Sequence, residues 1–220
     1  MKLVVFDMDG TLIDTHALIG EQMAAAFTGA GLPVPSPEAS RRVIGLSLPV
    51  AIGRLAQSDD PDLIDRLVET YRSNYRSTLE TTNDREPLFP GTREALDRLR
   101  ADEEAILGIA TGKGLTGVNR ILGVHGLTSY FTTLQTPDHN PSKPHPGMLL
   151  RAMAETGADT SQTIMVGDTT YDIGLANAAG VRSIGVTWGY HERDELIEAG
   201  ATVLIDRYED LDAALASLLE

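Results

Sequence analysis

Residues 1–12 read MKLVVFDMDGTL, a short apolar run that ends in two acids and a glycine. The apolar part, residues 3–6, predicts a strand that is covered on both faces. Asp7 stands at the end of this strand, Asp9 follows two residues later, and Gly10 allows a tight turn. Because ligands bind beyond the carboxyl ends of the strands in an open parallel sheet, this stretch predicts a first strand with an acidic site at its end.

Short apolar runs alternate with helical patterns along most of the remaining chain. The predicted strands are residues 3–6, 105–110, 132–135, 163–166, 183–186 and 202–205. The predicted helices between them are residues 93–100, 147–156, 171–179, 192–199 and 209–219. Several of these helices end at a glycine, a common helix C-cap: Gly157, Gly180 and Gly200. This alternation predicts an α/β fold, a Rossmann-like doubly wound parallel sheet with helices on both faces.

One stretch, from about residue 14 to residue 86, breaks this alternation because it contains helical patterns and no convincing strand. A first helix is expected over residues 16–30. Ser36 with Pro37, and Asp60 with Pro61, each place a capping residue before a proline, which is typical of a helix start. The simplest interpretation is a helical unit inserted into the sheet domain.

We therefore expect two parts in this chain. Residues 1–14 and 87–220 would form the Rossmann-like core, and residues 15–86 an α-helical cap. The hinges would lie near residues 14–15 and within residues 83–90, where prolines interrupt any regular element.

Composition restricts the classes of function. The 220 residues carry a formal net charge of −14, from 18 basic and 32 acidic residues, and no cysteine. The lack of cysteine excludes disulfides, thiolate metal sites and thiol nucleophiles. Excess negative charge disfavours nucleic acid and anionic lipid, and no segment has the pattern of a signal peptide or membrane span. We expect a cytoplasmic monomer or weak homodimer that binds neither nucleic acid nor membrane, and whose anionic substrate needs a local positive centre.

Polar residues follow other predicted strands as well. Asp168 and Asp172 come after the fourth predicted strand, so four acids, with Asp7 and Asp9, are expected at one edge of the sheet. Crowded carboxylates repel one another unless a cation lies between them, and hard oxygen ligands select Mg²⁺. Of Asp168 and Asp172, Asp168 is the stronger candidate for a metal ligand. Asp172 lies in the first turn of a predicted helix, where the helix dipole favours an acid even if that acid has no functional role. The sequence therefore predicts a magnesium site and, with it, a phosphate substrate.

Phosphoryl transfer assigns roles to these groups. Asp7 is the candidate nucleophile, which would form an aspartyl-phosphate and so divide one difficult displacement into two easier ones. Asp9 is the candidate acid and base, first protonating the leaving oxygen and then deprotonating the attacking water.

Other residues are expected to hold the phosphate. The turn at Met8 and Gly10 would direct backbone N–H groups at it. Thr111 and Gly112, after the second strand, would bind further phosphate oxygens, and Lys143, in a loop before the fourth strand, would neutralise remaining charge.

Together these residues resemble the signature of the haloacid dehalogenase superfamily in its phosphatase form. The matching segments are DMDGTL at residues 7–12, TG at 111–112, KP at 143–144 and GDTTYD at 167–172. They occur in the family's order, and the insert after the first segment is similar to the family's helical cap.

The resemblance implies specific roles. Asp7 would be nucleophile and magnesium ligand, and Asp9 the acid/base, with its backbone carbonyl on the metal. Asp168 would complete the metal ligands of the protein, with Asp172 supporting it directly or through water. The family's dehalogenases lack the second acid of the first segment, so Asp9 argues for phosphate chemistry.

A finer resemblance concerns the substrate. The runs KPHP at residues 143–146 and GYH at 189–191 are similar to phosphoglycolate phosphatases. Arg41 or Arg42 of the predicted cap would then pair with the substrate carboxylate. Two alternatives share much of this pattern, a phosphomutase of the β-phosphoglucomutase type and a pyrophosphatase. A non-hydrolytic phosphoacceptor signalling domain is a remote alternative, because such domains are shorter and have no helical insert.

Overall fold

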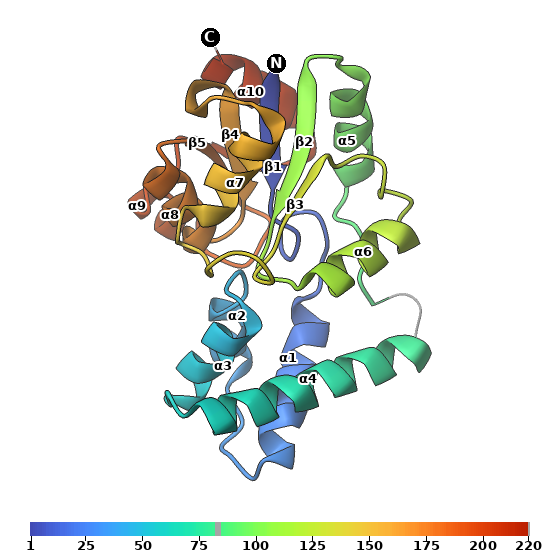
Figure 1. Cartoon of the computed structure of the whole chain (residues 1–220), viewed down its shortest axis with the longest axis vertical. Helices are drawn as coiled ribbons and strands as arrows, with labels where there is room; N and C mark the ends of the chain where they lie inside the picture. The colour runs from blue at the N-terminus through green and yellow to red at the C-terminus, as the bar shows by residue number, and fades with distance from the viewer. Residues whose placement is uncertain (82–84, 220) are drawn as a thin grey trace.

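A computed structural model describes residues 1–81 and 85–219, with an α/β core above a helical layer (Figure 1). Within these residues, six strands form one parallel sheet in the order β3-β2-β1-β4-β5-β6. The strands are β1 Lys2–Phe6, β2 Ala105–Ala110, β3 Thr133–Gln135, β4 Thr163–Gly167, β5 Arg182–Val186 and β6 Val203–Ile205. Each predicted strand is confirmed, and its bounds differ by at most one residue at either end.

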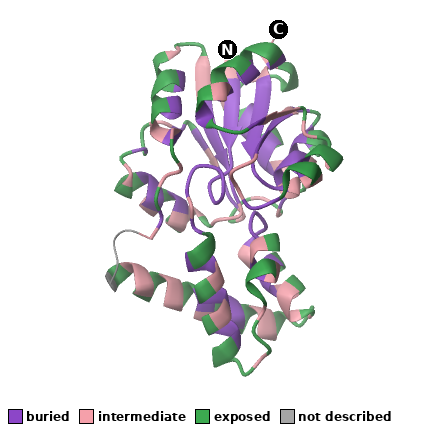
Figure 2. Ribbon diagram, turned by 180° about the vertical axis from the view of Figure 1, so that it is seen from behind, coloured by how far each residue is buried: buried purple, intermediate pink, exposed green. Residues whose placement is uncertain are grey.

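Helices cover both faces of this sheet, as the alternation of apolar runs predicts. They are α5 Thr92–Ala101, α6 Leu115–Val124, α7 Gly147–Thr156, α8 Thr170–Ala179, α9 Arg193–Glu198 and α10 Leu211–Leu219, with short 3₁₀ turns at Thr160–Gln162 and Tyr208–Asp210. Leu3 and Val5 of β1 pack with residues of α7 and α8, whereas Val4 and Phe6 pack with residues of α5, α6 and α10. The strands are therefore buried on both sides (Figure 2).

The sequence pattern did not predict α6. Its sequence, LTGVNRILGV, contains Gly117 and Gly123, which weaken the helical pattern, yet Val118, Ile121 and Leu122 are buried in the core. Packing against the sheet therefore decides this helix more than local propensity does.

Of the helices that lie between β1 and β2, all but α5 form the lower layer in Figure 1: α1 His16–Gly29, α2 Pro37–Arg42, α3 Leu48–Ala56 and α4 Pro61–Thr81. Ser36 caps α2 as expected, because its side chain accepts a hydrogen bond from Ala39 N. The layer has an apolar core of its own, which includes Met23, Phe27 and Leu67. We retain residues 15–86 as the proposed extent of the cap; its residues 82–84, and with them Asn83 of the expected hinge, lie outside the described residues.

The longest helix of the described residues is α4, with 21 residues. It is amphipathic, and it buries Leu67, Val68 and Tyr71 in the cap core. None of the helices in the described ranges combines the length and apolar character that crossing a bilayer requires.

The two connections between core and cap run side by side. Asp14 N donates a hydrogen bond to Pro87 O at 2.9 Å, and Phe89 N donates to Leu12 O at 3.0 Å. Ile13 also forms an isolated antiparallel bridge with Leu88. This pairing places both connections next to the turn that carries Asp7 and Asp9.

Candidate active site

Three carboxylates meet at the carboxyl end of the sheet. Asp7, Asp168 and Asp172 each offer an oxygen, these oxygens all lie within 4.8 Å of one another, and the three side chains are buried. Strand pairing accounts for this arrangement, because Phe6 of β1 lies beside Val166 of β4, so the residues that follow the two strands emerge together. The structure therefore brings together three of the four acids that the sequence places at this edge.

Lys143 is the positive charge within this cluster. Its Nζ lies 2.9 Å from Asp7 Oδ1 and 2.6 Å from Asp172 Oδ1, and the side chain is fully buried. Burial disfavours the charged amine, but the carboxylates of Asp172 and Asp7 outweigh it and raise the pKa of Lys143. The cluster thus holds three carboxylates and one ammonium, which contacts two of them, so full ionisation would leave an excess of negative charge inside the protein.

Two of these acids, Asp7 and Asp168, have raised pKa values, and burial is the main cause. Burial raises the pKa of Asp7 to about 7, with Lys143 opposing the shift and Asp172 adding to it. Burial, and then repulsion from Asp172 and Asp7, raises the pKa of Asp168 well above its ordinary value. Apart from the Lys143 ion pair, neither oxygen of Asp7 accepts a hydrogen bond from the described residues. An all-oxygen set with unpartnered buried acceptors fits a hard divalent cation such as Mg²⁺.

The later two acids are held by different partners. Asp168 accepts hydrogen bonds from Thr11 Oγ1 at 2.8 Å and Tyr190 N at 2.9 Å. Asp172 Oδ2 accepts from Thr169 N at 3.0 Å and Thr169 Oγ1 at 2.7 Å, in a capping box at the start of α8. Asp172 therefore lies in the cluster and also caps its helix.

Asp9 points to a different part of the site. Its Oδ1 accepts a hydrogen bond from Thr15 Oγ1 at 2.6 Å and lies 3.2 Å from Lys113 Nζ. The ammonium of Lys113 in turn lies 5.2 Å from the ring centre of Tyr75 on α4. The carboxylate of Asp9 is not part of the three-acid cluster. It thus faces the boundary between core and cap.

The predicted phosphate-binding residues lie around Asp7. Thr111 is buried at the end of β2, and its Oγ1 accepts a hydrogen bond from Lys113 N at 3.2 Å. Met8 is buried, and its carbonyl accepts hydrogen bonds from the turn that follows. Gly10 has φ +90°, and a Cβ there would lie 2.2 Å from Asp168 Oδ2. Only glycine fits this turn, because any side chain would be both strained and in contact with a site carboxylate.

Arg41 and Arg42 lie elsewhere. Arg41 pairs with Glu38 at 3.1 Å and Glu192 at 3.3 Å, and Arg42 pairs with Glu195. Neither guanidinium contacts the three-acid cluster, and both join α2 of the cap to the start of α9 in the core. The expectation that one of them pairs with a substrate carboxylate stays a prediction. In the structure both guanidinium groups form a cap-to-core contact, a long-range pairing that sequence spacing cannot reveal.

Sequence reasoning missed several residues that contact the acids: Thr11, Thr15, Lys113 and Tyr190. Lys113 could have been predicted from the sequence, because it directly follows Thr111 and Gly112 at the end of a strand. The role of Tyr190 depends on its backbone N–H and its hydroxyl, which accepts from Thr15 N at 2.8 Å. No residue-type pattern encodes that role.

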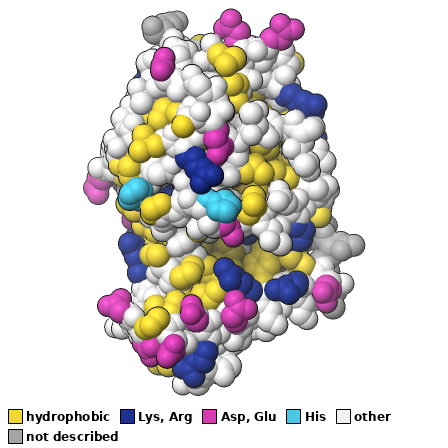
Figure 3. Space-filling view, viewed as in Figure 1, with side chains coloured by type: hydrophobic (Ala, Val, Ile, Leu, Met, Phe, Trp, Pro, Cys, Tyr) yellow, Lys and Arg dark blue, Asp and Glu magenta, His cyan; other side chains and the backbone are white. Residues whose placement is uncertain are grey.

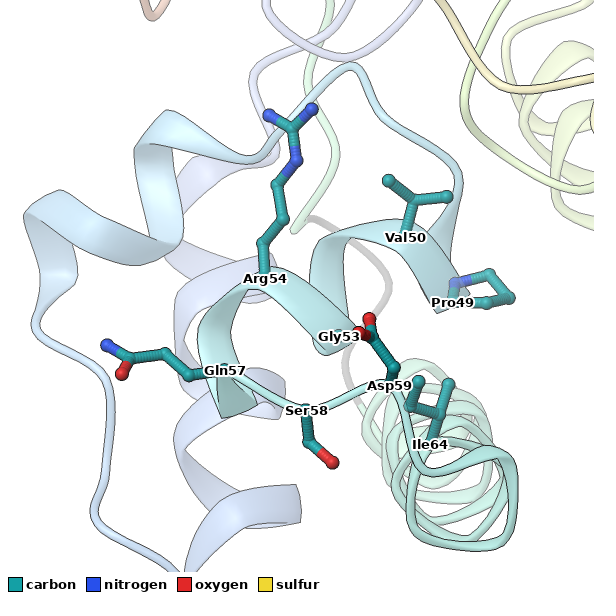
Figure 4. A pocket seen from close by; sticks show the side chains of 8 residues that line it. All are labelled: Pro49, Val50, Gly53, Arg54, Gln57, Ser58, Asp59 and Ile64. Carbon is teal, nitrogen blue, oxygen red and sulfur yellow. The ribbon is translucent and has the colours of Figure 1, made fainter.

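A separate open pocket of about 470 Å³ lies on the cap surface, between α3 and the start of α4. Figure 4 shows its lining side chains, which include Val50, Asp59 and Ile64 but none of the acids of the site. Arg54 extends away from Asp59 in this view and donates a hydrogen bond to the hydroxyl of Tyr171 at 3.1 Å. This pocket is distinct from the carboxylate cluster.

Comparisons with known proteins agree with the geometry. Residues 4–186 match the family described as haloacid dehalogenase-like hydrolase. A protein named Probable phosphatase IndB, from Dickeya dadantii, is 37% identical over 223 residues, which cover 99% of this chain and 95% of that protein. The Phosphoglycolate phosphatase of Agrobacterium fabrum is 33% identical over 218 residues, which cover 97% of this chain and 91% of that protein.

A solved structure gives the same result for the fold. The crystal structure of a predicted phosphatase from Clostridium acetobutylicum has a TM-score of 0.87 with this chain, covers 98% of both chains and is 24% identical. At that identity the likeness supports the fold alone, whereas the family match extends over most of the chain. The chain therefore belongs to the haloacid dehalogenase-like hydrolase family.

Proposed function

We propose that this chain is a magnesium-dependent phosphatase that hydrolyses small phosphate monoesters through an aspartyl-phosphate on Asp7. The observation that carries the proposal is the buried group of Asp7, Asp168 and Asp172 with Lys143 beside it, in which the oxygens of Asp7 have no partner other than Lys143 among the described residues. Such a cluster is tolerable when a cation and an incoming phosphoryl group share its charge. The names of the relatives from Dickeya dadantii and Agrobacterium fabrum support phosphatase chemistry.

The reaction has two steps. A carboxylate oxygen of Asp7 attacks phosphorus, the bond from phosphorus to the ester oxygen breaks, and Asp9 gives a proton to that leaving oxygen. Asp9, now a carboxylate, removes a proton from water, whose oxygen attacks phosphorus and releases inorganic phosphate and free Asp7. Lys143 and Thr111 hold the phosphoryl oxygens in both steps.

The metal would be held by Asp7 and Asp168, with Asp172 in support and with the backbone carbonyl of Asp9, as the family resemblance implies. When bound, Mg²⁺ supplies positive charge that draws the phosphate toward the carboxylates and stabilises charge on the group being transferred. The residues of the chain perform every proton transfer and every bond formation described above.

We expect metal binding to be measurable without any substrate. Added Mg²⁺ should raise the thermal unfolding midpoint, because an ion that binds only the folded state stabilises it by mass action. Its apparent affinity should weaken as the pH falls from 8 to 6, since protons compete for Asp7, whose pKa burial raises to about 7. Excess chelator should abolish phosphate release. Full activity in chelator, or a midpoint that Mg²⁺ does not change, would contradict the metal assignment, and Asp168→Asn should remove the midpoint shift.

The cap covers this site in the described arrangement. Ser47 N, at the start of α3, donates a hydrogen bond to Ser142 Oγ of the core at 2.9 Å, next to Lys143. Figure 3 shows that the face between core and cap is hollowed, with hydrophobic side chains inside and charged side chains at its edge. We propose that the cap excludes bulk water during transfer, so that hydrolysis uses the water that Asp9 activates.

The contact at Gly112 tests this role of the cap. A Cβ at Gly112 would lie 2.3 Å from Leu46 O, in the cap loop before α3. Gly112→Ala is therefore expected to leave the core folded but to prevent the cap from seating, which lowers kcat/KM by on the order of 10²-fold. Gly123→Ala in α6 is the matched control, because its added methyl group meets no atom within 4 Å. Equal activity of the two variants in a phosphate-release assay would argue against closure at this contact.

Phosphoglycolate is the first candidate substrate. The Agrobacterium fabrum relative bears that activity in its name, and the runs at residues 143–146 and 189–191 resemble the same enzymes. A panel of phosphate esters, assayed for magnesium-dependent release of phosphate, tests this choice. Conversion of a sugar phosphate to its isomer, dependent on a bisphosphate activator and without net release of phosphate, would favour the phosphomutase instead.

A further inference from the structure

One buried cation has no task in the proposed reaction. The chain contains three lysines, Lys2, Lys113 and Lys143. Lys143 lies between Asp7 and Asp172, and Lys2 forms a partly exposed pair with Asp102. The side chain of Lys113 is only 13% exposed and lies at the core–cap boundary. Burying a charged amine is costly, so its position calls for an anionic partner.

The partner of Lys113 within the described residues is a weak one. Among the described residues, Lys113 forms a single ion pair, in which its Nζ lies 3.2 Å from Asp9 Oδ1. This distance is longer than the range of about 2.7–2.9 Å that is typical of charge-assisted hydrogen bonds. The same Oδ1 already accepts a shorter hydrogen bond from Thr15. An ammonium group carries three donors, so Lys113 retains capacity for a further acceptor. When Asp9 is protonated to act as the acid, Lys113 also loses the charge that faces it.

The cap places a second donor beside this lysine. Tyr71 of α4 is 8% exposed, and its hydroxyl forms no hydrogen bond with the described residues. The ring centre of Tyr71 lies 5.7 Å from that of Tyr75, which in turn lies 5.2 Å from Lys113 Nζ. The hydroxyl of the neighbouring Tyr75 already donates a hydrogen bond to Glu86 at 2.5 Å, so it cannot donate to a ligand as well. The Tyr71 oxygen is not one of the fully buried polar atoms that lack a partner, so this hydroxyl is accessible at the core–cap boundary and can donate to a ligand there.

The other charged groups of this region are already paired. Glu86 also accepts from Arg120 at 2.5 Å, so its charge is compensated. Arg41 and Arg42 are engaged by glutamates at the opposite end of the cap boundary. Lys113 is therefore the cation that is positioned to meet an additional negative group next to Asp9.

We propose that Lys113 and Tyr71 bind a carboxylate on the leaving group, so that the enzyme selects phosphate monoesters of short hydroxy acids. This inference rests on the proposed phosphatase function. Asp9 must contact the ester oxygen to protonate it, and Lys113 Nζ lies 3.2 Å from Asp9. A substrate carboxylate bound by Lys113 must therefore be separated from the ester oxygen by only a few bonds. A carboxylate carries one negative charge, which one lysine neutralises, whereas a second phosphate would leave excess negative charge beside Asp9.

The test compares two esters of the same shape. Phosphoglycolate carries the carboxylate, and 2-phosphoglycolamide carries a neutral amide in its place. We expect the wild-type protein to prefer phosphoglycolate in kcat/KM by at least about 10-fold, and Lys113→Met to reduce this preference by about 10- to 100-fold. Tyr71→Phe, which keeps the ring packing, should reduce the preference by about 3- to 10-fold. Lys2→Met is the control, because it removes a partly exposed lysine at the start of β1, whereas Asp7 follows the end of that strand, and it should leave the preference unchanged.

Different outcomes separate this inference from the function on which it rests. If Lys113→Met lowers kcat/KM equally for both esters, Lys113 only orients Asp9 and the inference is wrong. A wild-type protein that hydrolyses both esters equally well overturns it too. Loss of magnesium-dependent release from every ester tested would overturn the phosphatase function, and the inference with it. Because Tyr71→Phe deletes only one hydroxyl, it keeps the test valid even if Lys113→Met does not fold.

Discussion

Asp7→Asn is expected to lower kcat by at least about 10⁴-fold while the protein remains folded. The amide has nearly the same volume as the carboxylate but cannot act as the nucleophile, so the aspartyl-phosphate does not form. All other groups of the site remain in place, including Lys143, which keeps its 2.6 Å contact with Asp172.

The same substitution should not destabilise the metal-free protein. Burial raises the pKa of Asp7 to about 7, above its value in the unfolded chain, so the ionised carboxylate opposes folding at neutral pH. Removing the charge relieves this cost, and the unfolding midpoint in chelator should stay level or rise, more so at pH 8 than at pH 6. Asp65→Asn, on the exposed side of α4, is the control for the substitution itself. Substantial turnover by Asp7→Asn would exclude Asp7 as the nucleophile.

Lys143→Met has the second largest expected effect, and it combines stability with activity. Methionine has a similar length and no charge, so Asp7 and Asp172 lose the ammonium that pairs with them. Breaking a buried ion pair by removal of one partner typically costs about 3–5 kcal/mol, and we expect a loss in that range in urea unfolding without metal. Mg²⁺ should restore part of it, since the ion replaces some of the missing positive charge.

Activity should fall as well, because Lys143 stabilises charge on the transferring group. Loss of one such group is expected to lower kcat by about 10²–10³-fold even in saturating Mg²⁺. Lys2→Met, at a partly exposed pair with Asp102, should leave both stability and activity close to wild type. If Lys143→Met unfolds at the same urea concentration as the wild-type protein, the buried carboxylates are not ionised and the electrostatic account of the site is wrong.

The sequence was sufficient for the layout of the core. Continuous apolar runs predict buried parallel strands, and the acids and the threonine that follow them must then share one edge of the sheet. That reasoning places Asp7, Asp168 and Asp172 together, as the structure does. The same reasoning did not predict helix α6, because two glycines weaken its local helical pattern and packing on the sheet compensates for them.

The sequence by itself determined the chemistry available at the site: strand-end carboxylates, a lysine in the preceding loop and a helical insert between the first two strands. Only the tertiary structure decided which charges meet across long distances in the chain. It pairs Arg41 and Arg42 with glutamates about 150 residues away, and it brings Lys113 of the core to Tyr75 of the cap. The physical reason is that strand order follows from local pattern, whereas ion pairs depend on side-chain directions that are fixed only once core and cap pack together.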